Sequence, residues 1–78
     1  MSPWSIPAGW TFVPGDESSC PAIERDVGAF TLTVGDDGGK WVWWVCSQGS
    51  NLGTANGAAT DMIDGVALSL DAVAKALA

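Results

Sequence analysis

The chain has 78 residues, nine of them acidic and three basic, which gives a formal net charge of −6. This length allows one domain with one core, and the charge disfavours direct binding to nucleic acids or anionic membranes, since both are polyanions. The chain contains no histidine, which excludes histidine as a general base or metal ligand. The longest apolar stretch, residues 41–46, is too short to span a bilayer.

The N-terminal part predicts an irregular lead-in followed by a short strand. Residues 1–8 are rich in Pro and Ser and lack the basic start and apolar run of a signal peptide, so we expect a cytoplasmic protein. Residues 9–13 alternate in character and predict a strand that ends at Pro14 and Gly15. A polar loop is expected over residues 16–21.

A longer strand region and a hairpin follow. Residues 23–34 predict one strand region, and Gly28 within it indicates a bulge or a bend. Residues 35–39 combine Gly and Asp, which tolerate positive φ, and predict a hairpin turn. Residues 40–47 are then expected to return as an antiparallel strand, followed by a loop over residues 47–53.

The strand at residues 40–47 carries Trp on both of its faces. Since side chains alternate along a strand, Trp41 and Trp43 share one face, and Trp44 lies on the other. We expect Trp41 and Trp43 to pack under a helix and Trp44 to contact a partner.

The C-terminal part predicts one helix, which begins between Thr54 and Thr60 and continues nearly to the end of the chain. Gly65 weakens this helix and is expected to allow close packing on a Trp. The face with helical spacing of apolar residues comprises Ala59, Met62, Ile63, Val66, Leu70, Val73 and Leu77. The opposite face comprises Asp61, Asp64, Asp71 and Lys75, with Leu68 among them.

These elements predict an α+β fold in a single domain over residues 1–78: a three- or four-stranded antiparallel sheet with one C-terminal helix packed on one face (βββα). A helix about 10 Å wide covers only one face of such a sheet. The other face is then exposed, covered by the lead-in, or buried in a partner.

The sequence gives little evidence for a catalytic or a metal site. Cys20 and Cys46 do not form a zinc motif, and without a secretory signal we expect two reduced thiols, with a disulfide as the alternative. Asp36 and Asp37 lie in a segment that has the composition of a calcium loop but not its ligand spacing. Adjacent acids in a hairpin are usually turn formers. We therefore expect a protein without enzymatic activity, cofactor or metal.

The acidic residues and Trp44 make up the predicted partner-binding set. Solubility alone is one explanation for so many acids. The other is a surface that imitates the charge of a nucleic acid and competes for a basic groove. The set is Glu24, Asp26, Asp36, Asp37, Trp44, Asp61, Asp64 and Asp71.

In size, charge and order of elements, from the strand at residues 9–13 to the C-terminal helix, the chain resembles the small phage-encoded anti-CRISPR proteins. Among these it is most similar to inhibitors of type I systems such as type I-C. No motif carries this resemblance, so no site residue is transferred. It implies a cytoplasmic inhibitor in a bacterial host, monomeric rather than homodimeric. Its partner is a crRNA-guided surveillance complex (Cascade), on which it occupies a Lys/Arg-lined surface and excludes target DNA.

Two other functions remain open at this stage. One is a phage or bacterial accessory module that self-associates, or docks a partner, through its Trp-rich sheet face. The other is a small carbohydrate-binding domain that uses Trp41 or Trp44.

Overall fold

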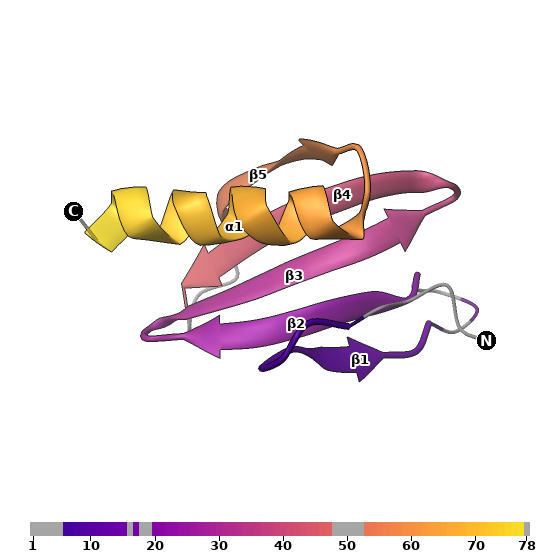
Figure 1. Ribbon diagram of the computed structural model, residues 1–78, viewed down its shortest axis with the longest axis horizontal. Helices are drawn as coiled ribbons and strands as arrows, with labels where there is room; N and C mark the ends of the chain where they lie inside the picture. The colour runs from indigo at the N-terminus through magenta and orange to yellow at the C-terminus, as the bar shows by residue number, and fades with distance from the viewer. Residues whose placement is uncertain (1–5, 16, 18–19, 48–52, 78) are drawn as a thin grey trace.

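The computed structural model describes residues 6–15, 17, 20–47 and 53–77 and shows an α+β fold (Figure 1). Five strands form one antiparallel sheet in chain order, and a C-terminal helix lies on one face. The predicted class is confirmed, but the sheet has five strands rather than three or four. The elements are β1 (Thr11–Val13), β2 (Ala22–Val27), β3 (Phe30–Asp37), β4 (Lys40–Ser47), β5 (Gly53–Ala59) and α1 (Met62–Leu77).

The region predicted as one strand over residues 23–34 is a hairpin of β2 and β3. Val27 pairs with Phe30, so Gly28 and Ala29 form the two-residue turn. Gly28 has a φ of 59°, which such turns require and glycine adopts without strain. The expectation of a bulge or bend at Gly28 was therefore wrong, because this glycine reverses the chain.

β5 begins at Gly53, the last residue of the predicted loop, and occupies the segment in which the helix was expected to begin. Residues 48–52 of that loop lie outside the described residues. Its composition of small residues has low β propensity, yet it pairs with β4 from Trp41–Ala59 to Val45–Ala55. Small residues leave room for the large side chains of β4. A Cβ atom on Gly57 would lie 3.0 Å from Trp43 Nε1. Tertiary packing thus overrides local propensity, and the helix begins later, at Met62.

The core lies between the sheet and α1. α1 packs on β3, β4 and β5, and Trp41 and Trp43 pack partly buried against this core, as predicted. Trp10, 7% exposed, belongs to the same core and adds an indole from the segment that precedes β1. The fully buried side chains that face α1 come from three strands: Ile23, Leu32, Val34 and Val45.

The apolar face of α1 is largely as predicted, but Ala59, which was assigned to it, is the last residue of β5. Met62 and Val73 are buried, and Val66 and Leu70 are partly buried against the core. Ile63, however, is 56% exposed. It follows Met62 directly and is turned about 100° around the helix axis, away from the sheet.

Gly65 permits a close approach of α1 to the sheet, but its neighbour is Val34 rather than a Trp. A Cβ atom at position 65 would lie 2.6 Å from Val34 Cγ1. Val34 itself is fully buried on β3. The close helix–sheet contact that was expected at Gly65 is therefore present, with an aliphatic partner.

Candidate protein-binding groove

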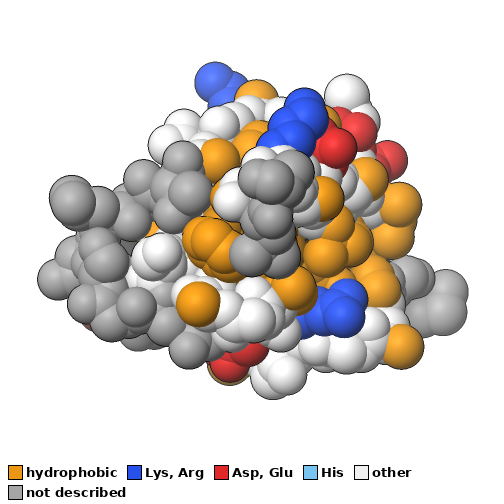
Figure 2. Space-filling view, turned by 90° about the vertical axis from the view of Figure 1, so that its left-hand side faces the viewer, with side chains coloured by type: hydrophobic (Ala, Val, Ile, Leu, Met, Phe, Trp, Pro, Cys, Tyr) orange, Lys and Arg blue, Asp and Glu red, His pale blue; other side chains and the backbone are white. Residues whose placement is uncertain are grey.

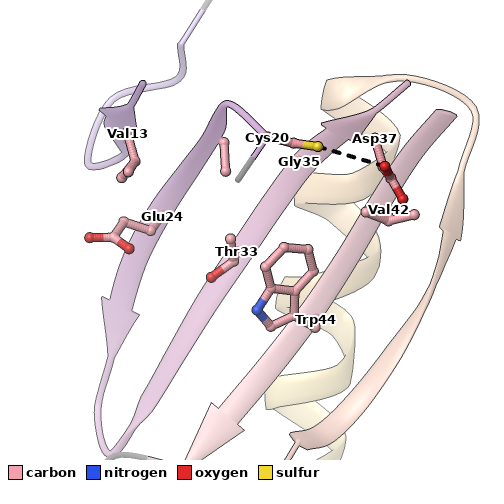
Figure 3. A pocket seen from close by; sticks show the side chains of 9 residues that line it. Val13, Cys20, Glu24, Thr33, Gly35, Asp37, Val42 and Trp44 are labelled. Carbon is pink, nitrogen blue, oxygen red and sulfur yellow. Dashed lines mark hydrogen bonds between the residues drawn. The ribbon is translucent and has the colours of Figure 1, made fainter. Parts of the chain in front are cut away.

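The sheet face opposite α1 carries a groove of about 450 Å³ (Figure 3). Because side chains alternate along each strand, every second residue of β1 to β4 points to this face. The strand register then places these residues in rows across the sheet, such as Glu24–Thr33–Trp44. The groove is lined by Val13, Cys20, Ala22, Glu24, Thr33, Gly35, Asp37, Val42 and Trp44.

Trp44 forms one wall of the groove. Its indole leans along β4 until its Cη2 atom lies 3.6 Å from the position that a Cβ of Gly35 would take. Gly35 and Ala22 are buried at the floor, whereas Trp44 is 37% exposed. An indole held on one side and open on the other offers a firm apolar surface for a ligand.

Two carboxylates border the groove. Figure 3 shows Glu24 and Trp44 on either side of Thr33, with Asp37 farther along beside Cys20. None of the described residues that line the groove is basic. Lys40 pairs with Asp37 in the register but is not part of the lining. The groove therefore combines an aromatic wall with a negative rim.

The thiol of Cys20 donates a hydrogen bond to Asp37 Oδ1 at 3.6 Å. Desolvation of the sulfur raises the pKa of Cys20, although the residue is exposed, and the hydrogen bond and charge of Asp37 and the charge of Asp36 raise it further. A thiol with a raised pKa stays protonated near neutral pH and is a poor nucleophile. Cys20 and Cys46 are both free, in agreement with the expected reduced thiols.

Asp26 and Asp36 lie outside the groove lining. Asp26 is on the same sheet face, next to the groove, and accepts a hydrogen bond from Thr31 Oγ1 at 3.0 Å. Asp36 alternates to the face that bears α1, opposite Trp41 in the register. Its Oδ1 accepts the N–H of Gly39 at 2.9 Å, so it stabilises the β3–β4 turn.

The acids of the helix lie across the sheet from the groove. Asp61 Oδ1 accepts the N–H of Asp64 at 2.7 Å, and Asp64 Oδ2 accepts the N–H of Thr60 at 3.0 Å. Asp61 is thus the N-cap residue of α1, and Asp64 ties the preceding residue, Thr60, to the first turn of the helix. Asp71 forms an exposed ion pair with Lys75 at 3.0 Å. The eight predicted residues thus do not form one surface.

Three of the predicted residues, Glu24, Asp37 and Trp44, meet in the groove, with Asp26 beside them. Figure 2 shows another side of the molecule, where basic and acidic side chains, some of them in contact, lie among hydrophobic ones. The prediction missed Gly35, which had been assigned to a turn, Val13, whose strand had no predicted register, and Ala22, which was in no predicted strand. Val42 could have been predicted as part of the groove, because it lies two residues before Trp44 on the same strand and therefore on the same face.

Among the described residues, no group of three or more His, Cys, Asp or Glu is placed to hold a metal ion. Within the same ranges, no helix has the length and apolar character needed to cross a bilayer. Comparison with protein-family models, with curated proteins and with solved structures finds no match for this chain. The groove is therefore the observation on which a functional proposal rests.

Proposed function

We propose that the protein is an acidic protein-binding inhibitor that docks through the groove on a Lys- and Arg-rich surface of its partner. The observation that carries this proposal is the exposed indole of Trp44 on a sheet face rimmed by Glu24 and Asp37. Trp is the residue type most enriched at binding hot spots. Carboxylates around it select a basic partner and repel an acidic one.

The net charge supports a role in competition with nucleic acid. At −6 the protein is attracted over several ångströms to any surface that binds phosphates, which raises its association rate. It need not copy the helical spacing of phosphates to compete. A stacked Trp and two carboxylates on a Lys/Arg-lined channel would exclude the nucleic acid sterically.

The specific target that we propose is a type I CRISPR surveillance complex, with type I-C first, in the cytoplasm of a bacterial host. This choice follows the resemblance to small phage-encoded anti-CRISPR proteins in size, charge and order of elements. In such complexes the guide–target duplex lies in a basic channel. We propose that a monomer of the protein occupies this surface and blocks binding of target DNA.

The alternative, a self-associating module with a Trp-rich docking face, has less support. Of the three Trp residues of β4, Trp41 and Trp43 pack against the core under α1, and Trp44 lies on the open face. Light scattering separates the two functions, since a homodimer that persists in high salt would favour the module.

The test is a gel shift of type I surveillance complexes on target DNA with the protein titrated in. We expect the shifted band to disappear near stoichiometric protein, and the inhibition to weaken with added salt. Asp37→Lys should weaken inhibition strongly. Asp71→Lys changes the net charge equally, but on the far side of the sheet, and should inhibit as the wild type does. Equal loss in both variants would mean that net charge acts without the groove. A shifted band that persists with every type I surveillance complex tested would refute this target.

A further inference from the structure

We propose that the groove recognises a single arginine side chain of the partner, stacked on Trp44 and paired with Glu24. This inference rests on the proposed function, because it names the chemical group that the docking surface binds. It goes beyond charge complementarity, since it separates arginine from lysine and from other cations.

The register supplies the geometry. Glu24, Thr33 and Trp44 form one row across β2, β3 and β4 on the open face. Neighbouring strands lie about 4.8 Å apart, so the backbones of Glu24 and Trp44 are separated by about 10 Å with Thr33 between them. Both side chains border the same hollow (Figure 3). Figure 3 draws the Glu24 carboxylate turned away from Thr33, toward the edge of the sheet. A planar cation that lies over Thr33 beside the indole therefore pairs with Glu24 when this exposed side chain turns toward it.

The rest of the lining suits the aliphatic part of an arginine. Val13, Val42, Ala22 and Gly35 provide apolar surface along the groove. Arg buries its methylene stem on such surface and keeps its charged end at polar groups. The groove, at about 450 Å³, holds one long side chain rather than a folded element.

Arginine fits this arrangement better than lysine. A guanidinium group is planar, stacks on an aromatic face, and donates in a fork that matches a carboxylate. An ammonium group is a compact and strongly hydrated charge, which gains less from an indole wall. Nucleic-acid bases also stack on Trp, but they bring phosphates, which Glu24 and Asp37 repel. The protonated thiol of Cys20 beside Asp37 agrees with a negative potential at the other end of the groove.

The experiment uses the full chain, labelled with ¹⁵N, and follows the indole N–H signal of Trp44, which the Trp44→Phe variant assigns. Three capped tripeptides, Gly-Arg-Gly, Gly-Lys-Gly and Gly-citrulline-Gly, are titrated to about 20 mM, because one charged side chain gives millimolar affinity. We expect saturable shifts with the Arg peptide and affinity lower by about tenfold with citrulline, which keeps the shape and lacks the charge. The Lys peptide should lie between them.

Variants connect the shift to the proposed contacts. Glu24→Gln should lower the affinity for the Arg peptide about tenfold. Asp71→Asn, on the other side of the sheet, should leave this affinity unchanged. The remaining backbone signals show whether each variant is folded. The inference is overturned if the Arg peptide does not shift the Trp44 signal, or if the citrulline peptide binds with equal affinity. It is also overturned if glucose oligomers shift the Trp44 signal and the Arg peptide does not.

Failure of this inference and failure of the proposed function are distinguishable. If the double variant Trp44→Ala/Glu24→Gln blocks DNA binding as well as the wild type does, the arginine site is refuted and the proposed inhibitor function is not. If the Arg peptide binds at Trp44 while no surveillance complex is inhibited, the arginine site stands and the inhibitor is refuted.

Discussion

Replacement of Gly65 by Ala tests the close contact between α1 and the sheet. A Cβ atom there would lie 2.6 Å from Val34 Cγ1 and 3.5 Å from the Cβ of Ala59, so the clash is with Val34. Val34 is fully buried and pairs with Ile23 on one side and Trp43 on the other, which leaves it little room to move. Overpacking of this kind costs about 1–3 kcal/mol. Against this, Ala stabilises a helix by about 1 kcal/mol relative to Gly.

We therefore expect Gly65→Ala to lower the free energy of unfolding by about 1 kcal/mol, with a drop in Tm of about 4–8 °C for a domain of this size. The same change made in a Val34→Ala background should instead raise the stability by about 1 kcal/mol, since the Cγ atoms are gone and the helical gain remains. The coupling energy between the two positions is then about 2 kcal/mol.

The assay is thermal and urea unfolding of the wild type, both single variants and the double variant, followed by circular dichroism and Trp fluorescence. If the Val34→Ala background is too unstable, the cycle is measured in trimethylamine N-oxide, which strengthens burial in all four proteins. Equal stabilisation of the wild type and of the Val34→Ala variant by Gly65→Ala would refute the proposed clash with Val34. That result would mean that α1 is not held as close to β3 as the structure places it.

Four further predictions concern the helix cap, the two indoles, the reactivity of Cys20 and the pH dependence of stability. Asp61→Ala should cost about 0.5–2 kcal/mol through loss of the helix cap, whereas Asp61→Asn should retain most of the stability in urea unfolding. Trp43→Ala should cost about 3 kcal/mol or more, because its indole packs in the core. Trp44→Ala should cost clearly less, as this side chain is 37% exposed. Because Asp37 helps to raise the pKa of Cys20, Asp37→Asn should increase the thiolate fraction and speed alkylation of Cys20 by iodoacetamide at pH 8, measured by peptide mass spectrometry. The sign of the shift also means that the fold loses stability as the pH rises through the raised thiol pKa, where deprotonation adds a charge beside two carboxylates. Equal rates of Cys20 alkylation in the wild type and in Asp37→Asn would contradict the proposed effect of Asp37 on the Cys20 pKa.

The parts of the fold that the sequence predicted correctly are those with a strong local pattern. The alternation of Trp41, Val42, Trp43 and Trp44 indicated which indoles face the helix, and the acidic turn before β4 indicated the hairpin. β5 was missed because its pairing depends on β4, and a run of small residues carries no periodic signal of its own. The β2–β3 turn was missed because one glycine within a continuous β pattern suits a bulge as well as a reversal.

The candidate site was predictable only in part, for a related reason. Parity along one strand placed Trp44 on the open face, but the meeting of Glu24 with Trp44 depends on the register of β2 on β3, which the undetected turn at Gly28 sets. The acids of α1 have the same charge as those of the groove. The role of Asp61 and Asp64 at the start of the helix became clear from the hydrogen bonds that they accept, which composition does not reveal.

The order of the elements along the chain has a consequence during synthesis. Each strand pairs with the next one in sequence, so the sheet can form by successive hairpins, which close in about 1–10 μs each. α1 follows all five strands and has 16 residues, which take about 1–3 s to synthesise at 5–20 residues per second. For that interval Ile23, Leu32 and Val45 have no helix over them. A chain that stops before Met62 should therefore leave these side chains uncovered and aggregate rather than fold.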